Sequence, residues 1–231
     1  MSVCESIRSR MHQTLRADER FCLICNASLD EIHSFEDLYA KHRTICTDCQ
    51  KQFKPIRKIF QIQNREWHIL YQYDDFLERL FFRYKEQRDI LLAPVFLERV
   101  QERLKIMKQY QVCGLCSSDQ HRLYRGFEPL IELFKPYGIE VLSPLYKTKP
   151  VKQSAQSKAK RKQIQAILKR KELYSLSDKK ILLVDDVCTT GSSLEAACQL
   201  LNPQCVFVLA AHPKWLQAHA SMGIEKKSSF W

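Results

Sequence analysis

The chain has 231 residues, enough for one sizeable hydrophobic core and a small appended module. Its 45% hydrophobic and 27% charged residues, with only 5 Gly, exclude a disordered or fibrous protein. No window approaches 18 consecutive apolar residues, and the first residues lack the apolar core of a signal peptide, so we expect a cytoplasmic protein without a membrane span. Its ten cysteines are therefore expected to be metal ligands or small core residues rather than disulfides.

Residues 1–60 are predicted to form a small module. Residues 1–20 are typical of a loose leader, and residues 21–60 combine two cysteine pairs with charged turns and little apolar periodicity. Such a segment buries little apolar surface, so its stability is expected to depend on something other than a core.

Four cysteines of this module have the spacing of a metal site. Cys22 and Cys25 form one CxxC pair, and Cys46 and Cys49 form a second. Two residues between thiols let both point at one ion, and two such pairs complete the tetrahedral sulfur shell that suits structural Zn²⁺. The binding energy of that ion would then be folding energy. An iron ion with the same ligands is one alternative, and four unpaired thiols in a core are another.

The remaining cysteines are interpreted as packing residues. Cys113 and Cys116 form a third CxxC, but no second pair is left to complete a shell. The other four are expected to behave as small hydrophobic side chains; they are Cys4, Cys188, Cys198 and Cys205.

Residues 61–231 alternate between strand and helix patterns, which predicts an α/β fold with a mainly parallel sheet. Apolar periodicity predicts helices over 76–84, 95–104, 127–134, 158–171 and 193–201. Short apolar runs predict strands over 110–113, 139–142, 181–184 and 205–210.

Almost all of the formal charge of +11 lies between Lys147 and Lys180, where twelve Lys and Arg accompany two acids. Such a block favours an anionic partner through counterion release, and nucleic acid is the obvious candidate. The alternative is a solvated, partly disordered loop leading into a polar helix. The residues expected to follow a DNA backbone are Lys158, Lys160, Arg161, Lys162, Lys169, Arg170 and Lys171.

The apolar run at 181–184 is followed by two acids and a hydroxyl-rich turn. Small residues around a glycine let backbone N–H groups converge on a phosphate, and the following helix adds its positive end. The predicted phosphate loop comprises Thr189, Thr190, Gly191, Ser192 and Ser193. Ser192 and Glu195 have the spacing of a capping box, which would start the helix here. Asp185 and Asp186 would suit ribose hydroxyls or Mg²⁺, although both acids could instead be plain turn residues.

The run D185-D186-V-C-T-T-G-S-S resembles the phosphoribosyl pyrophosphate motif of type I phosphoribosyltransferases. Joined to a four-cysteine module, it resembles the ComF family of late competence proteins. Further matches extend the resemblance from Phe21 to Leu201; they are Tyr73, F82-R-Y84 with Asp89, R125-G-F127, and Gln153 with Arg161.

The resemblance implies a zinc finger joined to a type I phosphoribosyltransferase-like domain. It further implies binding of phosphoribosyl pyrophosphate, with Mg²⁺, at Asp185 to Ser193. Members of the family act in DNA uptake during natural transformation, on single-stranded DNA and alongside a helicase-like competence protein. The expected location is the cytoplasm, at the inner face of the membrane near the DNA-uptake channel.

Several departures from the family pattern bear on catalysis. The chain reads RGFEP over 125–129 where the family usually reads RGFNQ, VCGLC over 112–116 where a proline-containing strand end is usual, and Ile164 where Asn is common. Some phosphoribosyltransferases hold an acidic general base at the position of Thr189, and threonine cannot serve as one at neutral pH.

Three hypotheses follow. The first, which we favour, is a competence protein that binds single-stranded DNA and a phosphoribosyl pyrophosphate-type ligand. The second is an active Mg²⁺-dependent phosphoribosyltransferase with an unknown acceptor. The third is a zinc-ribbon interaction module on an inert α/β scaffold.

Overall fold

The computed structural model describes residues 20–30, 43–115, 117, 119–147, 168–171 and 178–225. The chain forms two compact units, residues 1–51 and residues 52–231. Residues 58–60, which were predicted to end the small module, belong to a strand in the sheet of the larger unit.

The smaller unit carries its cysteines on a tight turn and on a short helix. In the turn, Phe21 bridges to Ser28, and Asn26 adopts the left-handed φ of 61° that closes the loop. The helix α3 (Thr47–Gln52) begins directly after Cys46. The buried hydrophobic residues in the described part of this unit are few: Cys22, Leu29, Ile45 and Cys49.

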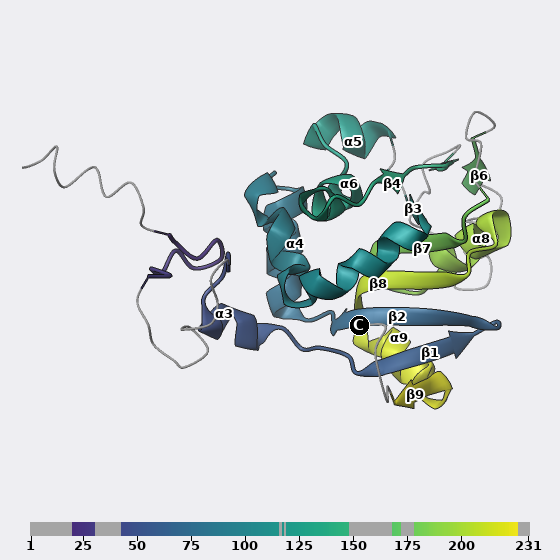
Figure 1. The fold of residues 1–231 in the computed structure, drawn as a ribbon, viewed down its shortest axis with the longest axis horizontal. Helices are drawn as coiled ribbons and strands as arrows, with labels where there is room; N and C mark the ends of the chain where they lie inside the picture. Colours follow the sequence, from purple (N-terminus) through teal and green to yellow (C-terminus); the bar gives the residue numbers. More distant parts are fainter. Residues whose placement is uncertain are drawn as a thin grey trace, which may run out of the picture. The chain divides into compact units, whose positions relative to one another are not determined.

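The larger unit is built on a seven-stranded, mainly parallel sheet (Figure 1). In chain order it contains β1 (Lys58–Ile62), β2 (Arg65–Gln72), α4 (Asp75–Lys85), η1 (Ile90–Phe96), η2 (Glu98–Gln109), β3 (Gln111–Gly114), α5 (Asp119–Arg125), α6 (Pro129–Phe134), η3 (Lys135–Tyr137), β4 (Val141–Leu142), β5 (Leu145–Lys147), β6 (Leu168–Arg170), β7 (Ile181–Cys188), α8 (Ser192–Leu201), β8 (Cys205–Ala211), α9 (Pro213–Ala218), η4 (Ala220–Met222) and β9 (Gly223–Glu225). The strand order is β4-β3-β7-β8-β2-β1-β9. The first five are parallel, and β1 and β9 add antiparallel pairings.

The hairpin of β1 and β2 was not predicted from the sequence. Gln63 and Asn64 join the strands with φ of 50° and 60°, the pair of left-handed conformations that a two-residue hairpin turn requires. Strand β2 then pairs in parallel with β8, which brings the hairpin into the main sheet.

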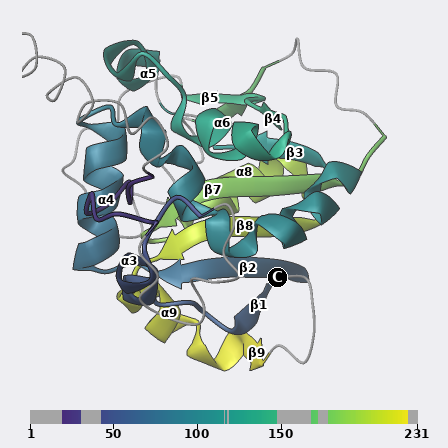
Figure 2. The ribbon, with the colours of Figure 1, turned by 60° about the vertical axis from the view of Figure 1, so that its left-hand side comes forward.

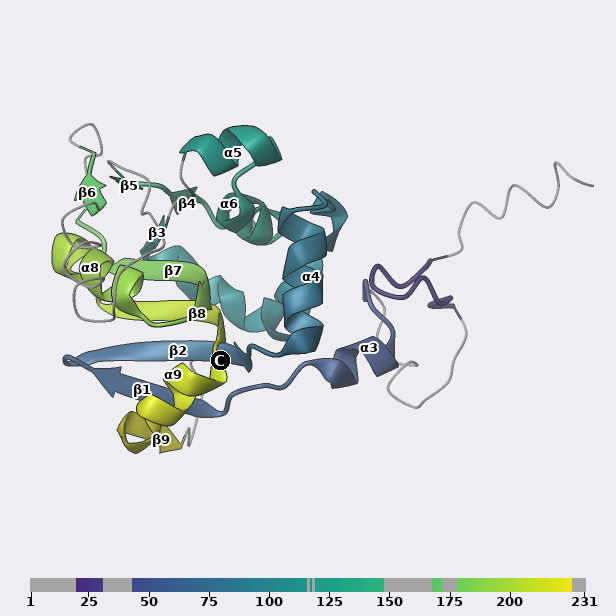
Figure 3. The ribbon, with the colours of Figure 1, turned by 180° about the vertical axis from the view of Figure 1, so that it is seen from behind.

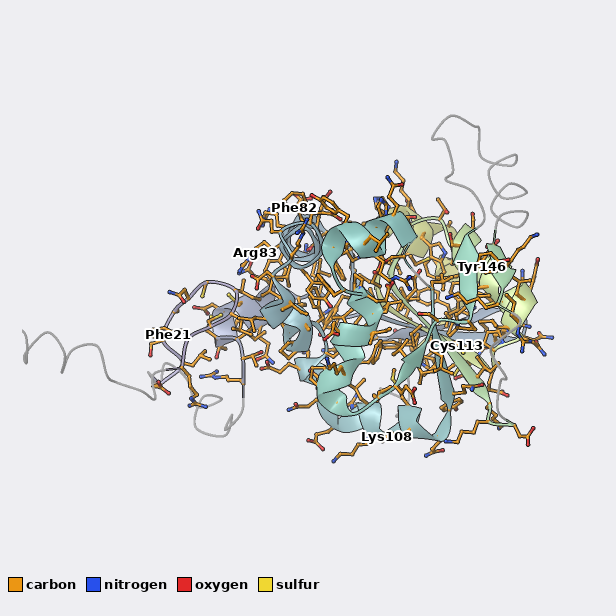
Figure 4. The ribbon with its side chains drawn as sticks, turned by 90° about the horizontal axis from the view of Figure 1, so that it is seen from above. Phe21, Phe82, Arg83, Lys108, Cys113 and Tyr146 are labelled. Atoms are coloured by element: carbon orange, nitrogen blue, oxygen red, sulfur yellow. The ribbon has the colours of Figure 1, made fainter. Side chains whose placement is uncertain are left out.

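Helical segments cover both faces of the sheet. Segments α4, η1, η2 and α6 lie on one face (Figures 1 and 2). On this face Phe134 of α6 packs edge-on against Phe207 of β8. Helices α8 and α9 lie on the opposite face, and Figure 3 shows them from that side. There Leu194 and Trp215 pack with Leu183 and Val206. The core therefore fills both sides of the central strands, and Cys113 of β3 lies inside it (Figure 4).

The predicted α/β fold with a mainly parallel sheet is confirmed. Strand β7 continues four residues beyond the predicted 181–184, so it includes both acids. The helix predicted over 158–171 is wrong at its end, because residues 168–170 form β6 and pair with β5. Leu168 is buried there and the next two residues are exposed, a pattern too short to distinguish from a helical one. None of the described helices is long and apolar enough to cross a membrane.

Candidate functional site

The two acids lie in the second half of the central strand β7, two residues before its end. This strand pairs with β3 and β8, and its residues Leu182 to Val184 are fully buried. Asp185 and Asp186 are both half-buried. Successive side chains of a strand point to opposite faces, so the structure does not direct both carboxylates to one side. The backbone N–H of Asp186 donates to Asp185 Oδ1 over 2.9 Å.

Asp186 faces helix α4, where it meets a cation that the sequence analysis did not single out. Lys85 Nζ lies 2.6 Å from Asp186 Oδ2, and both side chains are largely shielded from solvent. The same ammonium lies 4.9 Å from the centre of the Phe81 ring. Tyr73 stacks on Phe81, and burial, followed by the charges of Glu78 and Asp186, raises the pKa of its hydroxyl. The sequence offered one signal for Lys85, its position directly after the F82-R-Y84 match.

The loop after β7 has the features expected of a phosphate cradle. Gly191 adopts φ 78°, and a Cβ atom at this position would lie 2.8 Å from Trp215 Nε1. A glycine is therefore needed for both conformation and space. The ten-residue helix α8 begins at Ser192, so its positive end and its first N–H groups face this loop.

The start of α8 differs from the predicted capping box. The N-cap residue is Gly191, and Ser192 is already the first helical residue, so Ser192 and Glu195 do not form the reciprocal pair. The Thr190 hydroxyl takes part instead: it donates to Ser192 Oγ over 3.2 Å and accepts from the Ser192 N–H over 3.5 Å. Thr189 and Thr190 are exposed, whereas Ser193 is half-buried and Ser192 is buried.

Two further motifs of the resemblance contact one another beside this loop. The Tyr84 hydroxyl donates to the carbonyl of Pro129 over 2.8 Å, and its ring lies 5.4 Å from that of Phe127. Arg83 pairs with Asp89 over 3.0 Å. The motifs at 82–89 and 125–129, more than thirty residues apart in sequence, thus form one structural element of the site.

Arg125 and Glu128 of this element are held by a small polar network. The Arg125 guanidinium donates to Glu86 Oε1 over 2.5 Å and to Ser117 Oγ over 3.4 Å. Ser117 Oγ in turn donates to Glu128 Oε1 over 3.0 Å. Glu128 stands at the position where the family usually has Asn, so this chain carries an additional carboxyl group there.

The smaller unit brings the four predicted metal ligands together. The sulfur atoms of Cys22, Cys25, Cys46 and Cys49 all lie within 4.8 Å of one another. Cys25 Sγ and Cys46 Sγ are 3.6 Å apart. Ligand sulfurs at the usual Zn–S distance of about 2.3 Å are about 3.8 Å apart in a regular tetrahedron, so the cluster fits such an ion.

The protonation of these thiols also favours a bound cation. Burial by itself raises the pKa of Cys22, but the backbone N–H groups of Cys25, Cys46 and Ile24 bring it to about 7. Burial raises the pKa of Cys46 and of Cys49, and in Cys49 the neighbouring thiols add to the rise. A bound cation would therefore be needed to hold Cys46 and Cys49 deprotonated.

The predicted DNA-binding residues are described only in part. Lys169 and Arg170 are exposed on β6, and Lys171 is half-buried directly after it. The other four lie outside the described residues; they are Lys158, Lys160, Arg161 and Lys162. The predicted packing cysteines Cys113, Cys188, Cys198 and Cys205 are all buried, and Cys4 and Cys116 lie outside the described residues.

Comparison with known proteins agrees with this geometry. The model of the phosphoribosyl transferase domain matches residues 145–211, the segment that contains β7, the loop and α8. Competence protein ComFC of Streptococcus pneumoniae (strain ATCC BAA-255 / R6) is 26% identical over 205 residues, 78% of this chain and 93% of that protein. The chain is thus similar to a ComFC competence protein over most of its length.

A second competence protein is similar to this chain over most of its length. Competence protein ComFC of Bacillus subtilis (strain 168) is 25% identical over 199 residues, which cover 81% of this chain and 80% of that protein. The predicted resemblance to the ComF family is confirmed, as is a phosphoribosyltransferase-like fold with a four-cysteine cluster near the N-terminus.

Proposed function

We propose that this protein acts in natural transformation, where it binds a phosphoribosyl pyrophosphate-type ligand and single-stranded DNA. The observation that carries the proposal is the C-terminal half of β7 and the loop after it. Two carboxylates lie on the strand, and the loop combines threonine and serine hydroxyls with a glycine directly before α8. The relationship to proteins named for competence supplies the process.

The ligand's 5′-phosphate would lie at the loop residues Thr189 to Ser193, where N–H groups and hydroxyls supply donors without a bulky side chain. Asp185 and Asp186 lie on opposite faces of β7, so each would accept a hydrogen bond from a ribose hydroxyl on its own side of the strand. Their carboxylate oxygens are also the ligands that Mg²⁺ prefers, and the ion would neutralise the pyrophosphate charge. Lys85, which pairs with Asp186, would also contact an anionic group bound beside Asp186.

Calorimetric titration with phosphoribosyl pyrophosphate and Mg²⁺ tests the ligand site. Thr190→Asp places a carboxylate among the N–H groups, and we expect it to weaken binding by about 100-fold or more. Gln199→Asp, which adds the same charge at an exposed position of α8, is the matched control and should bind like the wild type. Equal affinity of Thr190→Asp and wild type would remove the ligand from this loop.

The DNA proposal depends on the basic segment from Lys147 to Lys180. Each phosphate contact that is lost should reduce the slope of log affinity against log salt by about 0.7 for a single strand. Alanine at Lys169 and Arg170 is expected to weaken binding of a single-stranded oligonucleotide and flatten that slope. Alanine at Lys105 and Lys135, exposed lysines elsewhere in the unit, is the control for net charge. An unchanged slope in the first variant would contradict DNA binding at β6.

The same loop supports a second candidate, an active Mg²⁺-dependent phosphoribosyltransferase. The match to the phosphoribosyl transferase domain favours it, whereas Thr189 offers no general base. Pyrophosphate release in the presence of a nucleobase or amine acceptor would establish turnover. Tight ligand binding without pyrophosphate release across a broad acceptor series would favour a binding site without catalysis.

A further inference from the structure

A cavity of about 370 Å³ lies on the sheet face that η2 covers, apart from the loop after β7. One wall is the segment from Pro55 to Ile59, and the other is η2. Its floor is formed by β2 and by Phe207 of the neighbouring strand β8. None of the residues from Asp185 to Ser193 lines it, so it is a separate site.

The rim of this cavity is strongly cationic. Arg57 and Lys58 contribute from the first wall, and Arg99 and Arg103 contribute from η2. All four are exposed at the surface, and no acidic side chain lines the cavity among the described residues. Within that part of the chain, none of the four lies within 4.0 Å of a carboxylate oxygen. Three guanidinium groups around one opening therefore keep their planar donor faces available for an anion.

The inside of the cavity is different from its rim. Ile56, Leu70, Val100 and Phe207 supply apolar surface. His68 forms part of the floor with 2% of its surface exposed, and its Nε2 lies 3.2 Å from Glu66 Oε2. A ligand that matches this arrangement carries an anionic group at one end and a largely apolar group with hydrogen-bonding atoms at the other.

We propose that this cavity binds a nucleotide, with its phosphate at Arg99 and Arg103 and its base on the apolar floor. The volume lies in the range of sites for small molecules, and the arginines provide the bidentate geometry that phosphate oxygens accept. The nucleotide can be free or part of a single strand of DNA, since both present the same phosphate and base. The inference does not rest on ligand binding at the β7 loop.

Titration calorimetry with dAMP, ribose 5-phosphate and inorganic phosphate tests this site. We expect dAMP to bind more tightly than the two probes without a base. Arg99→Gln with Arg103→Gln should weaken dAMP binding by about 100-fold, about tenfold for each guanidinium that is lost. Both side chains are exposed, so the variant is expected to fold. Lys105→Gln, on the same segment but outside the cavity, should change the affinity less than about twofold.

A second comparison separates this site from the β7 loop, which could also accept a 5′-phosphate. Thr190→Asp should retain dAMP binding, and the His68 ring signals in NMR spectra should shift on titration. Loss of dAMP binding in Thr190→Asp but not in Arg99→Gln/Arg103→Gln would overturn the inference while supporting the proposed function. The inference is also overturned if dAMP shows no binding at millimolar concentration, or binds no better than phosphate.

The source of the nucleotide is decided with a twenty-residue thymidine oligonucleotide. If Arg99→Gln/Arg103→Gln reduces the affinity for the oligonucleotide much more than Lys105→Gln does, the cavity holds a nucleotide of the strand. If dAMP binding is lost in this variant and oligonucleotide binding is unchanged, the cavity holds a free nucleotide.

Discussion

Glu128 places a carboxyl group on the side of the site that also holds Asp186. Burial raises the pKa of Glu128, the hydrogen bonds from Ser117 oppose the rise, and the charge on Asp186 adds to it. A carboxyl group whose pKa is raised by folding stabilises the protein below its unfolded pKa of about 4.3. This contribution is lost as the pH rises through the folded pKa.

We therefore expect Glu128→Gln to stabilise the larger unit at pH 7 by up to about 1 kcal/mol, because the amide keeps the acceptor for Ser117 without the charge. The difference from wild type should grow as the pH rises from about 4 to 7. Urea unfolding across this pH range measures it. Glu102→Gln, at a carboxylate that is 77% exposed, is the control and should show no such trend. A Glu128→Gln variant less stable than wild type at pH 7 would contradict the interpretation.

Lys85 and Asp186 are expected to be coupled energetically. Their side chains are 16% and 21% exposed, so each is shielded enough that losing its partner leaves a poorly solvated charge. Lys85→Met should lower the free energy of unfolding by about 1–3 kcal/mol. The double variant with Asp186→Asn should lose less than the sum of the single variants, and a double-mutant cycle measures this difference. The same cycle on the exposed pair Lys105 and Glu102 should give less than about 0.5 kcal/mol.

At the scale of elements, helix α4 positions both Lys85 and the motif at 82–89, and its start depends on Asp74. The Asp74 carboxylate accepts from the Leu77 N–H over 3.2 Å and pairs with Lys54 over 2.8 Å. Burial opposes the shift, but these two partners hold the pKa of Asp74 below its usual value. Its stabilising contribution is therefore present above the unfolded pKa and is lost as the pH falls through the lower folded pKa.

Asp74→Ala is expected to destabilise the larger unit by about 1 kcal/mol at pH 7, the usual effect of removing an N-cap. Asp74→Asn keeps an oxygen acceptor for Leu77 and should recover much of this loss. The gap between wild type and alanine variant should close as the pH falls below about 3.9. Urea unfolding at pH 7 and pH 3 checks both statements, and a gap that is unchanged at pH 3 would contradict the role of the charge.

The elements that the sequence predicted are those whose pattern is carried by many residues. Strand β8 is apolar along its whole length, and α8 has a long apolar face. The hairpin of β1 and β2 was missed because its turn is Gln63-Asn64 rather than a glycine-containing pair. Strand β6 was missed because three residues carry no periodicity, and its pairing with β5 is a long-range contact.

The residues of the candidate site also differ in whether the sequence could predict them. The loop at 189–193 and the four cysteines were predicted, because each depends on local spacing. Lys85 was not predicted, because its contact with Asp186 joins residues 101 positions apart through the packing of α4 on the sheet. The opposite orientation of the two acids was missed because β7 extends beyond its apolar run.

At the scale of the whole molecule, the two units differ in what stabilises them. The larger unit has a core on both faces of its sheet, whereas the described part of the smaller unit buries few hydrophobic residues around its cysteines. Metal binding to such a unit is folding energy, of the order of 10 kcal/mol for a four-thiolate site. We expect the larger unit, which has a core of its own, to be stable without that energy.

We expect a chelator, or Cys22→Ser, to unfold the smaller unit and leave the larger unit folded. In amide NMR spectra of the full chain, signals from residues 20–30 and 43–51 should collapse to unfolded positions, while those of β7 and β8 remain dispersed. Metal analysis should give one ion per chain, with zinc expected and iron the alternative, and Zn²⁺ added after chelator removal should restore the lost signals. A chain purified without metal that shows dispersed signals for these residues would contradict a structural ion, since the thiol cluster would then be stable by packing alone.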